Sequence, residues 1–188
     1  MLKSIEEFQK YVVITGFRNV RIKDINEFLK TINRETRSNV EIQFFNADII
    51  ATWQHLYFAG LNALTAFKNG ESFSKSLAME TMLYASAQCQ IRKATEIIGI
   101  KPNSTEIATL IIGEEPQTVK SALLKISERI NAEEDETVLK LTNEKTTKIK
   151  RTFGISNEEL AAVMKGRNQE EALVDIVIEK MALLATER

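Results

Sequence analysis

The most constraining feature of this sequence is a long stretch, residues 74–99, whose middle carries no charge. Between Thr81 and Ile91 there is no Asp, Glu, Lys or Arg. An apolar run of this length without Gly or Pro predicts one long helix, of roughly seven turns at 3.6 residues per turn. The serines at its start are good N-caps, and Gly99 suits the left-handed position that follows a helix.

On such a helix the residues divide between two faces. The face that must meet a core carries Leu77, Leu83, Tyr84, Ala87, Ile91, Ala94 and Ile98. The opposite face is small, half apolar and positive at its ends, with Lys75, Ala78, Met82, Ala85, Cys89, Arg92 and Lys93. Two interpretations stay open: a second surface that a partner covers, or a central helix packed between its own neighbours.

Length and composition place the chain among ordinary globular proteins. We expect residues 1–188 to form a single domain, with 132–150 as a less regular insertion. Lys and Arg number 25 and Asp and Glu 26, so any nucleic-acid binding has to be local. One cysteine allows no internal disulfide, and we find neither a signal peptide nor a membrane-spanning run. The expected localisation is cytoplasmic.

Strand and helix patterns alternate along the chain. The expected strands are 11–14, 40–44, the doubly buried run 107–112, and an edge strand at 138–141, which follows an acidic loop at 133–136. Besides 74–99, the expected helices are 25–34, 54–69, 116–130, 145–153, 157–164 and 169–186. The fold class is therefore α/β (α+β): a small, mixed, mostly antiparallel sheet packed with helices, with a helical C-terminal part.

The sequence contains no catalytic constellation that stands out. Its seven glycines form no phosphate loop, and one histidine with one cysteine cannot make a zinc site, so we expect no cofactor and no metal. The alternative of a small-molecule enzyme rests on His55, Glu80 and Cys89, although no base is positioned by sequence. Glu80 falls on the core-facing side of its helix, where a carboxylate needs partners such as backbone N–H groups, a lysine or His55.

The basic residues form two small sets. Arg18, Arg21 and Lys23 follow the first strand, and Lys75, Arg92 and Lys93 mark the ends of the outer face of the long helix. A groove with about four such side chains can hold a few phosphates, and single-stranded nucleic acid would add stacking on Met79, Met82 or Tyr84.

Four segments of the chain resemble one known family. They are 45–52 with 55–59, 79–91, 97–100, and 153–155 with 177–184. Together they are similar to the CGI-type subunit of the archaeal KEOPS complex, which is related to the human kinase-binding subunit TPRKB. The most specific part is Ala-Ser-Ala-Gln-Cys-Gln-Ile at 85–91, and the resemblance covers the chain from about Tyr11 onward.

The resemblance implies a noncatalytic role. KEOPS installs threonylcarbamoyl on the adenosine next to the anticodon of tRNA, and its transferase subunit performs the chemistry. The CGI-type subunit binds the atypical kinase/ATPase subunit and recruits tRNA through the single-stranded 3′ CCA end, so its link to the transferase is indirect. The alternative is a purely kinase-binding regulatory protein without RNA contact.

Carried over to this chain, the resemblance suggests two sets of contact residues. The expected tRNA-binding residues are Lys75, Met79, Tyr84, Gln88, Gln90, Arg92, Lys93 and His55. The expected kinase contacts are exposed apolar positions of the last helix: Leu173, Ile176, Val177, Met181 and Leu184. The alternative that any of these residues simply fills the core stays open. Cys89 stands where the family usually has a basic residue, which puts the electrostatic share of tRNA binding in doubt unless Arg92 and Lys93 substitute.

Overall fold

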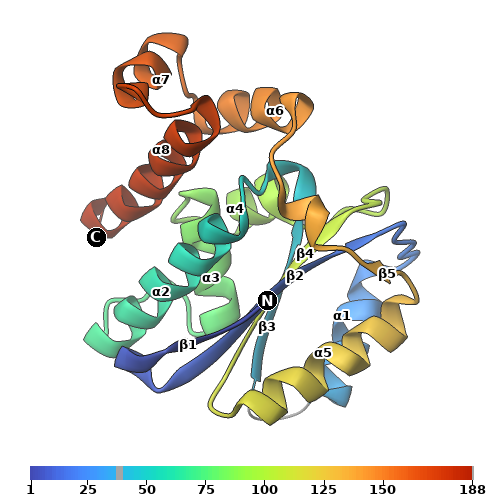
Figure 1. The fold of residues 1–188 in the computed structure, drawn as a ribbon. Helices are drawn as coiled ribbons and strands as arrows, with labels where there is room; N and C mark the ends of the chain where they lie inside the picture. Colours follow the sequence, from blue (N-terminus) through green and yellow to red (C-terminus); the bar gives the residue numbers. More distant parts are fainter. Residues whose placement is uncertain (37–39, 188) are drawn as a thin grey trace.

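An antiparallel sheet lies at the centre of the molecule (Figure 1). The computed structural model describes residues 1–36 and 40–187. Within them the sheet has five strands, with β1, β2, β4 and β3 in that order and β5 paired with the end of β2. The strands are β1 (Leu2–Ile5), β2 (Lys10–Arg18), β3 (Val40–Asn46), β4 (Ile107–Gly113) and β5 (Glu133–Glu134). The predicted α+β class with a mostly antiparallel sheet is confirmed.

Helices cover both faces of the sheet. On one face lie α1 (Ile25–Glu35) and α5 (Pro116–Ile130), and on the other α2 (Trp53–Asn69), α3 (Leu77–Ser86) and α4 (Ile91–Ile98) (Figure 1). The C-terminal part is helical, as predicted, with α6 (Asn143–Phe153), α7 (Asn157–Met164) and α8 (Gln169–Leu183). Short 3-10 turns are η1 (Glu6–Phe8), η2 (Ala47–Ile49), η3 (Glu136–Leu139) and η4 (Leu184–Glu187). Across the described residues, no helix is long and apolar enough to cross a membrane.

The central strand β4 is buried along its whole length, as its continuous apolar sequence predicts. Its side chains alternate between two cores. Leu110 packs with α2 and α3, whereas Ile111 packs with α1 and α5. A third cluster joins α6, α7 and α8. The sheet is therefore enclosed on both faces.

Capping residues fix the helix starts where the sequence places them. The carboxylate of Asp24 accepts the N–H of Glu27, and Ser156 and Glu159 form a complete capping box. Asn168 accepts the N–H of Glu171 at the start of α8.

The stretch 74–99 is two helices, so the prediction of one long helix is wrong. Ala87 takes a left-handed backbone with φ 50°, and α3 ends there. The N–H groups of Ala87 and Gln88 close α3 by donating to the carbonyls of Tyr84 and Leu83. Gly99 is extended instead of left-handed; a Cβ there would lie 2.5 Å from the carbonyl oxygen of Thr95.

The segment 132–150 is also more regular than predicted. Glu133–Glu134 is strand β5, which pairs with Phe17 and Arg18, so the acidic patch is not simply a loop. The expected strand at 138–141 is wrong, because Glu136–Leu139 forms η3. Val138 and Leu139 are buried against the core, which ties this segment to the body of the molecule.

Candidate functional site

Helices α3 and α4 form a hairpin. The Oγ1 of Thr95 lies 3.6 Å from the sulfur of Met82, so α4 packs back along α3. Ser76 at the start of α3 and Gly99 after the end of α4 line one groove, which places these two ends together. The turn 87–90 is at the opposite end of the hairpin, about 15 Å away along ten residues of helix.

The first half of the hairpin is a core helix. Seven of its ten residues, 80 to 86, are buried. The two carboxylate oxygens of Glu80 accept the N–H groups of Phe73 and Ser74 at 3.1 and 2.7 Å. The prediction that Glu80 needs partners is confirmed, and backbone groups supply them. For α3, the interpretation of a helix packed between its own neighbours is therefore correct.

His55 connects α2 to the end of α3. Its ring is fully buried and lies edge-on to Phe153, with centroids 5.7 Å apart. The N–H of Ala51 donates to Nδ1 at 3.2 Å, so Nε2 carries the proton and donates to the carbonyl of Ala85 at 2.8 Å. Burial lowers the pKa of His55 to about 4, since the charged form cannot be solvated there.

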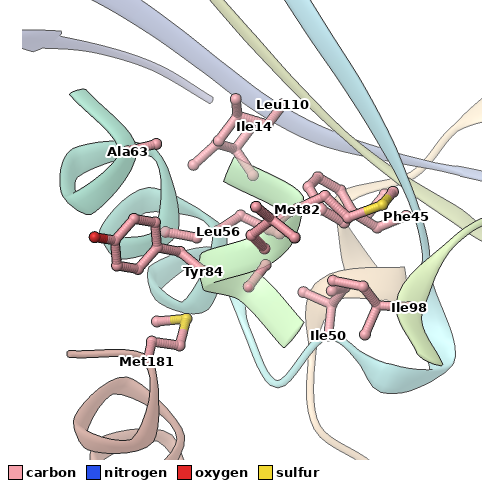
Figure 2. Packing of buried hydrophobic residues seen from close by; sticks show 14 of the residues in the cluster. Ile14, Phe45, Ile50, Leu56, Ala63, Met82, Tyr84, Ile98, Leu110 and Met181 are labelled. Carbon is pink, nitrogen blue, oxygen red and sulfur yellow. The ribbon is translucent and has the colours of Figure 1, made fainter. Parts of the chain in front are cut away.

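Two of the expected tRNA contacts are therefore wrong as surface residues. His55 has no exposed area. Tyr84 is 2% exposed and lies in the core between Ala63 of α2 and Met181 of α8 (Figure 2). Tyrosine and histidine at helical spacing here serve packing, and neither ring can stack on a base in this conformation.

The residues of the enzyme alternative do not form a reactive site. Both nitrogens of His55 and both carboxylate oxygens of Glu80 are held by backbone groups, so neither is placed to activate the exposed thiol of Cys89. In the described part of the chain, no group of three His, Cys, Asp or Glu residues could hold a metal ion.

The turn and the first turn of α4 are the exposed end of the hairpin. Gln90, Arg92 and Lys93 are exposed and Gln88 is half-buried. Gln90 occupies the N-cap of α4 without a side-chain capping bond, so the first N–H groups of the helix have no capping side chain. A helix N-terminus flanked by two cations favours an anion.

The ion pair at this end is weak. The Nε of Arg92 lies 2.9 Å from Glu96 Oε1, but the two side chains are 90% and 62% exposed. Surface pairs at this spacing contribute only about 0.3–0.5 kcal/mol. Arg92 can therefore exchange its partner for a phosphate at little cost.

Two other residues that we expected to bind tRNA, Lys75 and Met79, lie away from the turn 87–90. Lys75 is exposed but precedes α3, at the opposite end of the hairpin. Met79 is half-buried and lines the groove beside the start of α3. The four residues brought together are Gln88, Gln90, Arg92 and Lys93, since they surround one turn.

Comparison with known proteins now identifies the family. A family model described as "Kinase binding protein CGI-121" matches residues 17–185. The chain belongs to the CGI-121 family. It is 31% identical over 173 residues to the "Regulatory protein Cgi121" of Methanocaldococcus jannaschii, which covers 92% of this chain and 97% of that protein. The resemblance found in the sequence is confirmed, and the family is one of regulatory, kinase-binding proteins.

For this CGI-121 protein, the expected kinase contacts on the last helix are not exposed. Leu173, Val177 and Met181 have no exposed area, Ile176 has 1% and Leu184 2%. They fill the clusters that join α8 to α2, α6 and α7, so the prediction of an exposed apolar face is wrong. The exposed large apolar residue of α8 in the described chain is Leu183, at 54%.

Sequence reasoning missed an aromatic ridge on α2 of the CGI-121 protein. Trp53, Tyr57 and Phe58 are half-buried, and their rings contact one another edge-on, with centroids 6.1 and 5.6 Å apart. The Nζ of Lys3 lies 4.4 Å from the Trp53 ring centre. The sequence did contain a signal for this ridge, because residues at i and i+4, such as Trp53 and Tyr57, are neighbours on the surface of a helix.

Proposed function

We propose that this CGI-121 protein is the noncatalytic KEOPS subunit that binds the kinase/ATPase subunit and recruits tRNA through its 3′ CCA end. The modification would be threonylcarbamoylation of the adenosine next to the anticodon, performed by the transferase subunit. The observation that carries the RNA part is the exposed end of the α3–α4 hairpin, where the N-terminus of α4 coincides with Arg92 and Lys93.

The chemistry of this end suits a short single strand. The helix N-terminus and two cations can neutralise the few phosphates of a three-nucleotide tail. The amides of Gln88 and Gln90 can both donate and accept, as base edges require, and Ile91, 48% exposed, offers an apolar surface to a base. A site this small is compatible with a net charge of −1. The tail is therefore assigned to Gln88, Gln90, Arg92 and Lys93, with Lys75 and Met79 outside it.

We propose that the kinase subunit contacts helices α2 and α8, away from the turn of the α3–α4 hairpin. Helices α2 and α8 pack against each other; α2 carries the half-buried aromatic ridge and α8 carries the exposed Leu183. Aromatic and large aliphatic side chains that remain partly exposed are typical of protein interfaces. The two binding surfaces are then distinct, so one can be altered without the other.

Binding of two tRNA forms tests the RNA part. A gel shift with tRNA that carries or lacks its CCA end should give binding of the intact form only. Co-purification with the kinase subunit should be unaffected when the CCA end is removed. Equal binding of both tRNA forms would contradict recruitment through the CCA end. Binding of neither form would favour the second candidate, a kinase-binding regulator without RNA contact, which Cys89 in a usually basic position supports.

A further inference from the structure

The outer edge of β3 lies at the bottom of a groove. The groove has a volume of about 750 Å³ and is bordered by Ile25 and Leu29 of α1 on one side and by Leu77 and Met79 of α3 on the other. Within the described residues, β3 pairs only with β4, so its second edge has no strand beside it. An edge of this kind presents a row of backbone donors and acceptors.

The hydrogen-bond pattern identifies which backbone groups point outward. In the register, Asn46 is opposite Ile107, so Ala47 is opposite Glu106, and the N–H of Ala47 donates to the carbonyl of Glu106 at 3.3 Å. Paired residues alternate along an antiparallel ladder, so the odd-numbered residues of β3 bond to β4. The N–H and C=O of Val40, Ile42 and Phe44 therefore face away from β4.

A side-chain contact agrees with this assignment. The Nε2 of Gln43 donates to the carbonyl of Phe44 at 3.1 Å, so the side chain of Gln43 occupies one outward acceptor of β3. Ile42 is half-buried, and its N–H and C=O lie between the two walls of the groove.

The two edges of the sheet differ in how they are protected. At the other edge, β1 is only four residues long and carries Lys3, which lies over Trp53. In contrast, β3 has seven residues, no Lys, Arg or Pro, and an uninterrupted register with β4. Its one charge, Glu41, is turned aside to accept the N–H of Ala78 at 3.2 Å. Short strands, lysines, prolines and bulges are the usual protection against strand addition, and β3 has none of them.

We propose that this groove binds an extended segment of a partner protein, which adds as a strand beside β3. Only an extended backbone offers donors and acceptors at the spacing that the N–H and C=O groups of Val40 and Ile42 and the N–H of Phe44 present. Each wall combines apolar side chains, such as Leu29 and Leu77, with uncharged polar ones, such as Asn33 and Ser76, so the segment carries apolar or uncharged polar residues on both of its faces. The occupant we propose is a short isolated segment and not the β3 edge of a second copy, because that edge would come flanked by its own α1 and α3, the same helices that border this groove.

Amide exchange on the unmodified protein provides the first test. The probe is a synthetic peptide with the sequence of residues 107–112, which in the folded protein belong to β4 and pair with the inner edge of β3. Two lysines at each end of the peptide make it soluble. Its control is the same peptide with Pro in place of the residue corresponding to Leu110. The probe should slow exchange at the amides of Ile42 and Phe44, whereas the amides of Glu41 and Gln43 are protected by β4 beforehand.

A pair of variants tests the backbone role directly. Ile42→Pro removes an outward N–H without removing a bond to β4, and Ile42→Ala trims the side chain but keeps that N–H. Losing this hydrogen bond and the strand geometry should weaken probe binding about tenfold relative to Ile42→Ala. If Ile42→Pro does not fold, the amide-exchange measurement on the unmodified protein still tests whether the probe binds beside β3.

Three results would overturn the proposal. The proline peptide could bind as well as the probe, which would mean unspecific apolar contact. The probe could instead slow amides at 90–93 and leave Ile42 unchanged. Lastly, an RNA oligonucleotide ending in CCA could displace the probe and protect the Ile42 amide itself, which would assign the groove to RNA. The first two results do not depend on whether the CCA end binds at the turn of the hairpin, whereas the third would also contradict the proposed tRNA site.

Discussion

Helices α3 and α4 come from one apolar stretch and have opposite environments. Seven of ten residues are buried in α3, against two of eight, Ala94 and Ile98, in α4. The first helix is held by backbone bonds to Glu80 and by His55, whereas the second exposes Ile91, Arg92 and Lys93. The charge-free residues of α3 therefore serve the core, and the proposed tRNA-binding surface begins at the turn that follows them.

The largest expected difference between the two helices is the effect of truncating an aliphatic side chain. Leu83→Ala in α3 removes a fully buried side chain and should lower the free energy of unfolding by about 2–5 kcal/mol. Ile91→Ala in α4, where the side chain is 48% exposed, should cost no more than about 0.5 kcal/mol. Urea denaturation of both variants measures this, and equal losses would contradict the contrast.

Removal of one glutamate from each helix should also lower the stability of the protein more in α3 than in α4. Glu80→Ala leaves the N–H groups of Phe73 and Ser74 without their acceptor and should cost about 1–3 kcal/mol. Glu96→Ala removes only an exposed ion pair with Arg92 and should change stability by less than about 0.5 kcal/mol. Thermal denaturation of the two variants at pH 7 provides the measurement.

The pH dependence of stability tests the link between α2 and α3. His55 is the one histidine of the chain, and its pKa is lowered from 6.5 to about 4 in the folded state. Below pH 6.5 the unfolded state therefore binds a proton that the folded state does not, so stability falls as pH falls. The loss should be about 2 kcal/mol between pH 6.5 and about 5, above the range of ordinary carboxylates. An unchanged slope in His55→Gln would show that another group is responsible.

The smallest effect is expected at the turn itself. Ala87 holds a left-handed backbone, φ 50°, that glycine adopts more readily. Ala87→Gly should raise the free energy of unfolding by about 1 kcal/mol. Ser86→Gly, one residue earlier in the helical backbone of α3, should instead destabilise. Stabilisation by both would point to another cause.

Much of the fold could be predicted because local signals agree with the tertiary structure. The apolar run of β4, Pro116 at the start of α5 and the capping residues Asp24 and Ser156 all lie where their chemistry requires. In these elements periodicity, capping and burial point to one answer.

The errors arise where tertiary contacts override local preference. Alanine and glutamine are good helix formers, so nothing local marks the break at Ala87, which packing of α4 along α3 stabilises. The same limit applied to the candidate site. Apolar residues such as Leu173 and Tyr84 look alike whether they face a partner or a neighbouring helix, and here they face their own core.

Charge reversal at the two ends of the α3–α4 hairpin tests the central claim most directly. Arg92→Glu with Lys93→Glu alters the turn end, and Lys75→Glu is the matched control at the other end. Measured by tRNA affinity against salt concentration, the double variant should lose binding at low salt and reduce the salt slope by about 1–2, with unchanged stability. Lys75→Glu should bind tRNA almost as the unmodified protein does. Equal loss in both, or loss only with Lys75→Glu, would contradict the account.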